Sequence, residues 1–370
     1  MGRGLIKIAF WACLLLFSAV GWADPEGENL PCWAFRPVHG DTVGAVGWAR
    51  ADYRPDQQAA QRARFRAAYQ LATYAGAGKE GIFRAAGLQD RNATTGFGRS
   101  SIGFPYQFRT EARIYVYGVL DPRTAEPPPK ACQRVCQPAE CQPPWLCQPM
   151  GQDQAGFLGV SAGARTLHRQ YRLAVSNAQA LMKLIYGVEV KAISAYEQKQ
   201  KNGESSRRSQ QESDLDFRSG QVKNTRVIPA ARCRSGQHAF VHVLAPDLDP
   251  LPGSQKQDWF SNPHLGEKTG GIGSSVVPVS GRISEQITIA IRKALVALAM
   301  AKDVHVTGET KVARDKDGRF MLQRVAQSTE ALVKGKVAGL RFLGEGIERR
   351  VRVWVVEAGK EGGSERSAGS

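Results

Sequence analysis

Apolar and polar positions follow one pattern that occurs three times along the chain. Each copy opens with Trp-x-x-x-Pro, continues with an apolar stretch carrying two spaced glycines, and then becomes alanine-rich with a helical period. Apolar residues at steps of four lie on one face of a helix, so each copy is predicted to contain one helix packed through that face. The residues of this face are Ala63, Ala67, Leu71, Ala174, Ala178, Met182, Ala290, Ala294 and Leu298.

Alternating stretches predict the strands of each copy. Residues 112–117, 238–243 and 351–356 alternate in the manner of a strand with one buried face, as do the shorter stretches 187–193 and 304–307. Residues 219–228 match residues 334–343 position by position, which predicts a middle strand in the last two copies. The polar stretch 199–216 is interpreted as a long loop. The centre of the first copy has no clear match.

The spacing of the rare residues makes the repeat specific. The proline lies four residues after the tryptophan, and the glycines lie seven and ten residues after the proline, without gaps. We interpret these residues as packing elements, with the tryptophan and proline closing one end of each domain. The repeat motif consists of Trp33, Pro37, Gly44, Gly47, Trp145, Pro149, Gly156, Gly159, Trp259, Pro263, Gly270 and Gly273.

Together these patterns predict an α+β fold of three tandem small domains, each an Ala-rich helix packed on a mostly antiparallel sheet. The predicted repeats cover residues 30–120, 143–246 and 257–358. A Pro- and Cys-rich linker at 121–142 joins the first two repeats. Residues 359–370 are predicted to be a disordered tail.

The N-terminus has the order of a secretory signal peptide. Basic residues precede an apolar run, and small residues stand just before Asp24, so residues 1–23 are predicted to be removed. A retained N-terminal anchor is the alternative. No later stretch has the roughly 20 apolar residues of a membrane-spanning helix, so we expect no transmembrane segment in the mature chain.

The cysteines and the charge narrow the class of protein. Six cysteines remain after the leader, and an even number in an exported chain favours disulfides, with 15 pairings open. Their spacing does not fit a zinc site, and we expect no metal or cofactor. The net charge of +16 favours anionic partners such as envelope lipid or polymer. The disulfide candidates are Cys32, Cys132, Cys136, Cys141, Cys147 and Cys233.

Catalytic motifs are scarce. Residues 159–163 fit the G-x-S-x-G pattern of serine hydrolases, with Ser161 as nucleophile, but the equivalent position is Ala49 in the first copy and Ser275 in the third. Glycines near Lys79 lack the spacing of a phosphate loop. The basic residues lack the interleaved aromatic residues of a nucleic-acid platform, so no nucleic-acid partner is expected.

The Trp-x-x-x-Pro opening, the Gly-x-x-Gly strand, the Ala-rich helix and the apolar final strand together resemble the small envelope domains of the LPP-twenty lipoprotein family and the N-terminal domain of flagellar assembly protein T. The resemblance is best in residues 258–358. It implies a non-enzymatic scaffold in the periplasm or at the outer membrane, with partners in an outer-membrane or flagellar assembly. The chain differs in having three copies and no lipid-attachment cysteine after the leader.

Three functional hypotheses follow from the sequence. We favour a non-enzymatic exported envelope scaffold that binds envelope proteins through its three modules. The alternative is a binder of anionic envelope polymer or lipid through a basic surface. The distant alternative is a serine hydrolase centred on Ser161.

Overall fold

The computed structural model describes most of the chain. The described residues are 30–52, 56–77, 95–97, 100–150, 155–164, 166–185, 188–201, 204–214, 226–248, 250–251, 258–301, 307–314, 320–333, 335–344 and 346–357. The predicted leader at 1–23 and the predicted tail at 359–370 lie outside these residues, as do residues 304–306 of one predicted strand.

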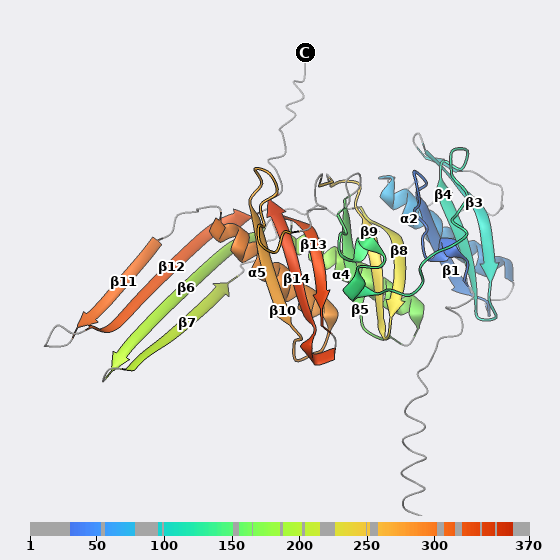
Figure 1. Cartoon of the computed structure of the whole chain (residues 1–370). Coiled ribbons are helices and arrows are strands. Elements are labelled where there is room, and N and C mark those ends of the chain that lie inside the picture. The colour runs from blue at the N-terminus through green and yellow to red at the C-terminus, as the bar shows by residue number, and fades with distance from the viewer. Residues whose placement is uncertain are drawn as a thin grey trace, which may run out of the picture.

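Three modules follow one another along the molecule (Figure 1). The first contains β1 (Gly44–Arg50), α2 (Asp56–Tyr74), β2 (Thr95–Phe97), β3 (Ser100–Arg109) and β4 (Arg113–Leu120). The second contains β5 (Gly156–Ser161), α4 (Leu167–Ile185), β8 (Ile228–Ser235) and β9 (His238–Leu244). The third contains β10 (Gly270–Val276), α5 (Ile283–Ala301), β13 (Gly335–Leu343) and β14 (Arg350–Glu357), with a short 3-10 turn η5 (Gly346–Glu348) before β14.

All three modules share one sheet topology. The strand orders are β1-β4-β3, β5-β9-β8 and β10-β14-β13, with β2 added at the edge of the first sheet, and every pairing is antiparallel. The last strand of each module therefore lies in the centre, and the helix packs across the sheet. The expected α+β fold of three small modules is confirmed.

The second glycine of each motif brings the helix close to the sheet. A Cβ atom at Gly47 would lie 1.7 Å from the carbonyl oxygen of Ala63, and one at Gly159 would lie 2.0 Å from that of Ala174. At Gly273 the distance to the carbonyl oxygen of Ala290 would be 1.9 Å. Any side chain here would push the helix away, so the glycine and the small residues of the helix are one packing device.

The second and third modules also contribute to a shared sheet. It consists of β6 (Val188–Lys201), β7 (Glu204–Asp214), β11 (Thr307–Arg314) and β12 (Phe320–Val333) in the order β11-β12-β6-β7. Figure 1 shows it as an arm that extends away from the three modules. The two modules are joined where β12 pairs with β6, from Leu322 opposite Lys199 to Val333 opposite Val188.

Two sequence interpretations are wrong in this region. Residues 199–216 do not form a long loop, because they fall largely in the β6–β7 hairpin; their polar composition hid β7, which pairs with β6 of the same module. The match of residues 219–228 with 334–343 is also shifted, since β8 begins only at Ile228. The β6–β7 hairpin precedes β8, and the β11–β12 hairpin precedes β13. Each hairpin therefore separates the middle strand of its module from the helix before it.

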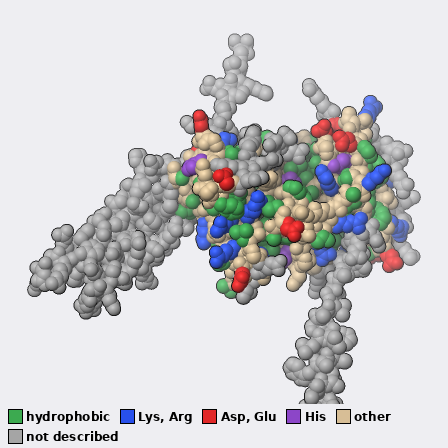
Figure 2. All heavy atoms as spheres, viewed as in Figure 1, with side chains coloured by type: hydrophobic (Ala, Val, Ile, Leu, Met, Phe, Trp, Pro, Cys, Tyr) green, Lys and Arg blue, Asp and Glu red, His purple; other side chains and the backbone are tan. Residues whose placement is uncertain are grey.

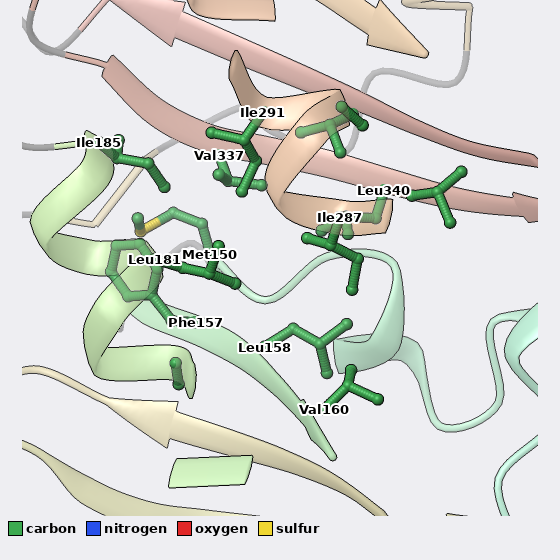
Figure 3. Packing of buried hydrophobic residues seen from close by; sticks show 14 of the residues in the cluster. Met150, Phe157, Leu158, Val160, Leu181, Ile185, Ile287, Ile291, Val337 and Leu340 are labelled. Carbon is green, nitrogen blue, oxygen red and sulfur yellow. The ribbon is translucent and has the colours of Figure 1, made fainter. Parts of the chain in front are cut away.

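The hydrophobic core is divided unequally among the modules. One cluster of buried residues runs without interruption through the second and third modules, as the neighbouring side chains of Met150, Leu158, Ile291 and Leu340 illustrate (Figure 3). Two further clusters are centred on the first module. One of them also includes Ile228 and other residues of the second module. Within the described part of the chain, no helix has the length and apolar character needed to cross a membrane.

Candidate functional site

Each Trp-x-x-x-Pro segment folds onto the centre of its own sheet. We call residues 33–37, 145–149 and 259–263 the lead segments. In the first module the Trp33 ring stacks on the Tyr117 ring with centroids 5.6 Å apart. The Tyr117 hydroxyl donates a hydrogen bond of 2.9 Å to the carbonyl oxygen of Pro37. The lead segment is therefore held by one stacked ring and one buried hydrogen bond.

The same arrangement occurs twice more with different chemistry. In the second module Trp145 stacks on His242 at 5.6 Å, and His242 Nε2 lies 2.8 Å from the Pro149 carbonyl oxygen. In the third module Trp259 stacks on Trp354 at 5.8 Å. The indole N–H of Trp354 donates a hydrogen bond of 2.6 Å to the carbonyl oxygen of Pro263.

The partners of the lead segments are phenol, imidazole and indole, which share a flat ring and an N–H or O–H donor. Burial raises the pKa of Tyr117 and lowers the pKa of His242 to about 4. His242 is therefore neutral near pH 7, and because a carbonyl only accepts hydrogen bonds, its Nε2 atom carries the proton. The first motif glycine makes room for this ring, since a Cβ atom at Gly44 would lie 2.4 Å from the Tyr117 ring.

The lead segments also join neighbouring modules. The backbone N–H of Arg232 on β8 donates a hydrogen bond of 2.8 Å to the carbonyl oxygen of Phe35. The backbone N–H of Leu340 on β13 donates one of 2.7 Å to the carbonyl oxygen of Cys147. Phe35 and Cys147 are both the second residue after the motif tryptophan. The first and second lead segments therefore each dock on the edge strand of the module that follows.

The register shows that these two junctions are equivalent. Arg232 lies opposite Val241, which lies opposite Gly159. Leu340 lies opposite Val353, which in turn lies opposite Gly273. The same position of the third strand thus accepts the preceding module in both cases.

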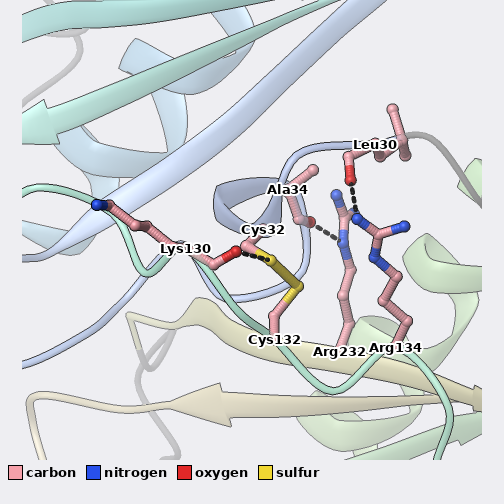
Figure 4. The surroundings of a disulfide bond; sticks show 7 residues. All are labelled: Leu30, Cys32, Ala34, Lys130, Cys132, Arg134 and Arg232. Carbon is pink, nitrogen blue, oxygen red and sulfur yellow. Dashed lines mark hydrogen bonds between the residues drawn. A yellow bond between two sulfur atoms is a disulfide. The ribbon is translucent and has the colours of Figure 1, made fainter.

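The junction between the first two modules contains several cationic and aromatic side chains. The Arg232 guanidinium lies over the Tyr171 ring, 4.7 Å from its centroid, and donates from Nε to the carbonyl oxygen of Ala34. Arg134 donates a hydrogen bond of 2.8 Å to the carbonyl oxygen of Leu30 (Figure 4). These guanidinium groups are satisfied by carbonyl oxygens and ring faces.

His168 of α4 connects this junction to the first sheet. Its ring centroid lies 3.6 Å from that of Trp48, and the Arg66 guanidinium lies 4.5 Å from the same indole. Burial, together with nearby arginines that include Arg232 and Arg113, lowers the pKa of His168 to about 2. The imidazole is therefore a neutral packing group at any physiological pH.

Three disulfides fix the segment between the first two modules. Cys32 pairs with Cys132, and Cys136 pairs with Cys233 of β8. Cys141 pairs with Cys147 within the region of the short 3-10 turns η3 (Pro138–Glu140) and η4 (Pro144–Leu146). The six candidate cysteines thus form three disulfides, as their even number predicts, and such bonds are typical of proteins outside the cytoplasm.

An open cavity of about 330 Å³ lies on the first module at the exposed edge of β3. Its lining combines two arginines, two aromatic rings and small polar or apolar groups. The lining residues are Arg64, Phe104, Pro105, Tyr106, Gln107, Arg109 and Val116. A site of this composition fits a segment that has both an apolar side chain and hydrogen-bonding main chain.

Ser161, the nucleophile of the distant hydrolase hypothesis, is a buried strand residue. It ends β5 of an antiparallel sheet, and its hydroxyl donates a hydrogen bond of 2.7 Å to the carbonyl oxygen of Gln170. The helix begins six residues later, at Leu167. A nucleophile elbow requires a sharp turn from a parallel strand directly into a helix, and this geometry differs from it.

In the described part of the chain, the other histidines and glycines that could bind a ligand do not converge on one site. His238 and His242 lie on the same strand, but only His242 reaches a motif residue. Gly271 and Gly273 pack against the backbone of α5, and Lys79 lies outside the described residues. Among the residues that the structure describes, no group of three potential ligands could hold a metal ion.

The three donor rings on the final strands were not among the site residues that the sequence pattern predicted. Tyr117, His242 and Trp354 occupy the same position relative to the motif glycines, but their residue types differ. The available signal was an aromatic or imidazole residue at one fixed position of each final strand. It could have been found by aligning the copies on the glycines through to the last strand.

On the one face that Figure 2 shows, the charged side chains of the described residues do not gather into a single patch. Lysine and arginine side chains are spread over the described modules on this face, with acidic side chains between them.

No family model, no curated protein and no solved structure matches this chain.

Proposed function

We propose that the protein is a non-enzymatic exported scaffold of the bacterial envelope that binds other proteins through its repeated modules. The repeated junction supports this proposal most directly. In it, a preformed lead segment docks on the free edge of a β-sheet, which is a mode of protein recognition as well as of module packing. The six cysteines of the described residues are paired in disulfides, which suits the oxidising periplasm.

The distribution of side chains supports a binding role over a catalytic one. The motif residues contact one another or the backbone of the helix, as the Trp33–Tyr117 and Gly47–Ala63 contacts show. The exposed faces of the helices differ, with Phe65 and Tyr69 exposed on α2 and Leu173 exposed on α4. A frame that is repeated three times with different exposed side chains is suited to contacts with different partners.

In-cell photo-crosslinking tests the proposal. A photoreactive amino acid is placed at Tyr69, which is 50% exposed, or at Leu173, which is 42% exposed. We expect crosslinks to a small set of envelope proteins, identified by mass spectrometry. The same amino acid at Leu71, which is buried, serves as the control. Absence of protein crosslinks from every exposed position would contradict the scaffold. Intact mass of the exported chain shows whether it begins near Asp24.

The second candidate is a binder of anionic envelope polymer or lipid. It is supported by the exposed arginines Arg62 and Arg66 on α2 and Arg169 and Arg172 on α4. Sedimentation with vesicles containing anionic lipid tests it, with neutral vesicles as the control. Binding that is lost at about 0.5 M salt favours this candidate, because salt at this concentration screens exposed charges beyond a few ångströms.

A further inference from the structure

The two junctions repeat one interface, and the first and third modules each carry one half of it that no described segment occupies. A lead segment of one module meets the edge strand of the next in both junctions. Among the residues that the structure describes, no segment docks on the lead segment of the third module or on β3 at Gln107, where β3 extends beyond its pairing with β2. A heterologous interface that repeats in this way continues for as long as further modules are added.

The third lead segment has the same local fold as the two that are docked. The backbone N–H of Asn262 donates to the carbonyl oxygen of Asp258, as that of Arg36 donates to Cys32 and that of Gln148 to Pro144. Trp259 is buried to 2% exposure and stacked on Trp354. The segment is therefore preformed without a partner, which reduces the entropy cost of binding.

Its outer residues differ from the docked ones in exposure. The first residue after the tryptophan is Ala34 in the first module and Leu146 in the second, and both are 0% exposed. In the third module this residue is Phe260, which is 38% exposed. The next residue, Ser261, is also exposed, whereas its equivalents Phe35 and Cys147 are buried. A large apolar side chain is thus partly exposed at the position where the first module buries Ala34 and the second buries Leu146.

The first module carries the matching docking position, on β3. Gln107 lies opposite Val116, which lies opposite Gly47, so Gln107 occupies the position of Arg232 and Leu340. Gln107 is exposed, and the register directs its backbone N–H out of the sheet edge. The cavity of about 330 Å³ lies at this position and includes Phe104 and Tyr106 in its lining.

We propose that the protein associates head to tail with a second copy of itself. The third lead segment of one copy docks in the cavity of the first module of the next. The Gln107 backbone N–H donates to the carbonyl oxygen of Ser261, and the Phe260 ring enters the cavity. The interaction rests on main-chain pairing and on burial of the Phe260 ring, which stacks on Trp259 of its own copy and lies 5.2 Å from the Arg352 guanidinium.

This inference rests on the proposed scaffold function, and it specifies a second copy of the chain as a binding partner. Because both ends belong to every molecule, the association is open-ended and forms chains or a closed ring. A weak interface between copies is expected, since a single lead segment buries less area than a standard protein interface.

Two variants, each broken at one end, provide the test. Phe260→Asp removes the apolar side chain of the lead segment. Gln107→Pro removes the N–H at the edge strand, where proline is tolerated because the N–H faces outward. Gln107→Ala keeps the N–H and is its matched control, and Phe65→Asp is the control for Phe260→Asp because Phe65 is a similarly exposed ring on α2, at 37%. Folding of each full-length, oxidised chain is checked by near-UV circular dichroism.

The association state is measured by sedimentation velocity at about 100 µM protein. This concentration is high enough to populate complexes of micromolar affinity. We expect the mass of the wild type and both controls to rise with concentration, and each broken variant alone to remain a single chain. An equimolar mixture of Phe260→Asp and Gln107→Pro keeps one intact half of each type, so it should form a complex of one copy of each and nothing larger.

Three results would overturn the proposal: a wild type that stays a single chain at this concentration, a mixture without complex, or a symmetric dimer unaffected by both variants. If Gln107→Pro does not fold, the wild type and Phe260→Asp still decide. If self-association is absent but crosslinking still finds other envelope proteins, the head-to-tail inference fails and the scaffold proposal stands.

Discussion

The two junctions between modules use the same main-chain hydrogen bond and different side chains. Between the second and third modules, apolar residues such as Met150, Ile291 and Leu340 continue one core across the boundary. Between the first and second, Arg232, His168 and Tyr171 surround the equivalent bond, and the Cys136–Cys233 disulfide adds a covalent link. Backbone geometry therefore defines the junction, and the side chains determine its strength and its sensitivity to conditions.

This difference predicts how the molecule unfolds. Modules that share a large continuous core are expected to unfold together, and the first two modules, which share a smaller apolar cluster beside a polar boundary, are expected to separate first. The second and third modules are further joined by the β6–β12 pairing in the arm.

Trp259→Ala should have the largest effect. The ring is 2% exposed and stacks on Trp354, so its loss should lower the free energy of unfolding by about 3–5 kcal/mol. Hydrogen exchange should increase in both the second and third modules and much less in β1–β4. Val276→Ala, in the same module but at a side chain that is 62% exposed, is the control, with an expected effect within about 0.5 kcal/mol. A loss below about 1 kcal/mol for Trp259→Ala would show that the ring does not support the core.

Leu340→Ala tests the apolar junction directly. Leu340 is 1% exposed within the cluster shared by the last two modules, so urea unfolding should show a loss of about 2–5 kcal/mol. Leu343→Ala, on the same strand but 38% exposed, is the matched control. Equal effects of the two substitutions would mean that the junction is not a continuous core.

The Cys136–Cys233 disulfide tests the polar junction. Replacing both cysteines with serine should lower stability by about 2–4 kcal/mol, because the bond closes a long loop in the unfolded chain. The two cysteines are 97 residues apart. The Cys141–Cys147 pair is only six residues apart, so the same double substitution there should cost less. Exchange should increase mainly at the boundary of the first two modules. The reverse order of effects would contradict this assignment.

Acid should weaken the polar junction by a smaller amount. The pKa of His168 is about 2 in the folded protein and 6.5 in the unfolded chain, so below about pH 6.5 only the unfolded chain takes up the proton. The contribution of neutral His168 to the free energy of unfolding is complete above about pH 6.5 and decreases as the pH falls toward 2. We expect a loss of about 1–3 kcal/mol between pH 7 and 4.5. His168→Gln should reduce this dependence and leave the part contributed by His242, whose pKa is lowered to about 4 by burial. A wild type and a His168→Gln variant with the same pH profile would rule out this role.

Much of the fold could be predicted from local pattern. The helix faces built on Ala63, Ala174 and Ala290 and the alternating final strands follow from periodicity, because each helix and strand must bury one face. The glycine spacing could be predicted as a packing motif. The physical contact behind it, a helix carbonyl less than 2.5 Å from where a Cβ atom would be, appears only in three dimensions.

The sequence by itself determined three copies of one α+β frame, six cysteines able to pair and a basic surface, because these depend on residue type and local spacing. The tertiary structure alone decided the disulfide pairing, the β6–β12 sheet and the docking of each lead segment on the next module. Contacts of this kind form between residues far apart in the chain, and main-chain hydrogen bonds leave little trace in side-chain pattern. For the same reason the unused halves at Gln107 and Ser261 could be recognised only by comparison with the two junctions that are occupied.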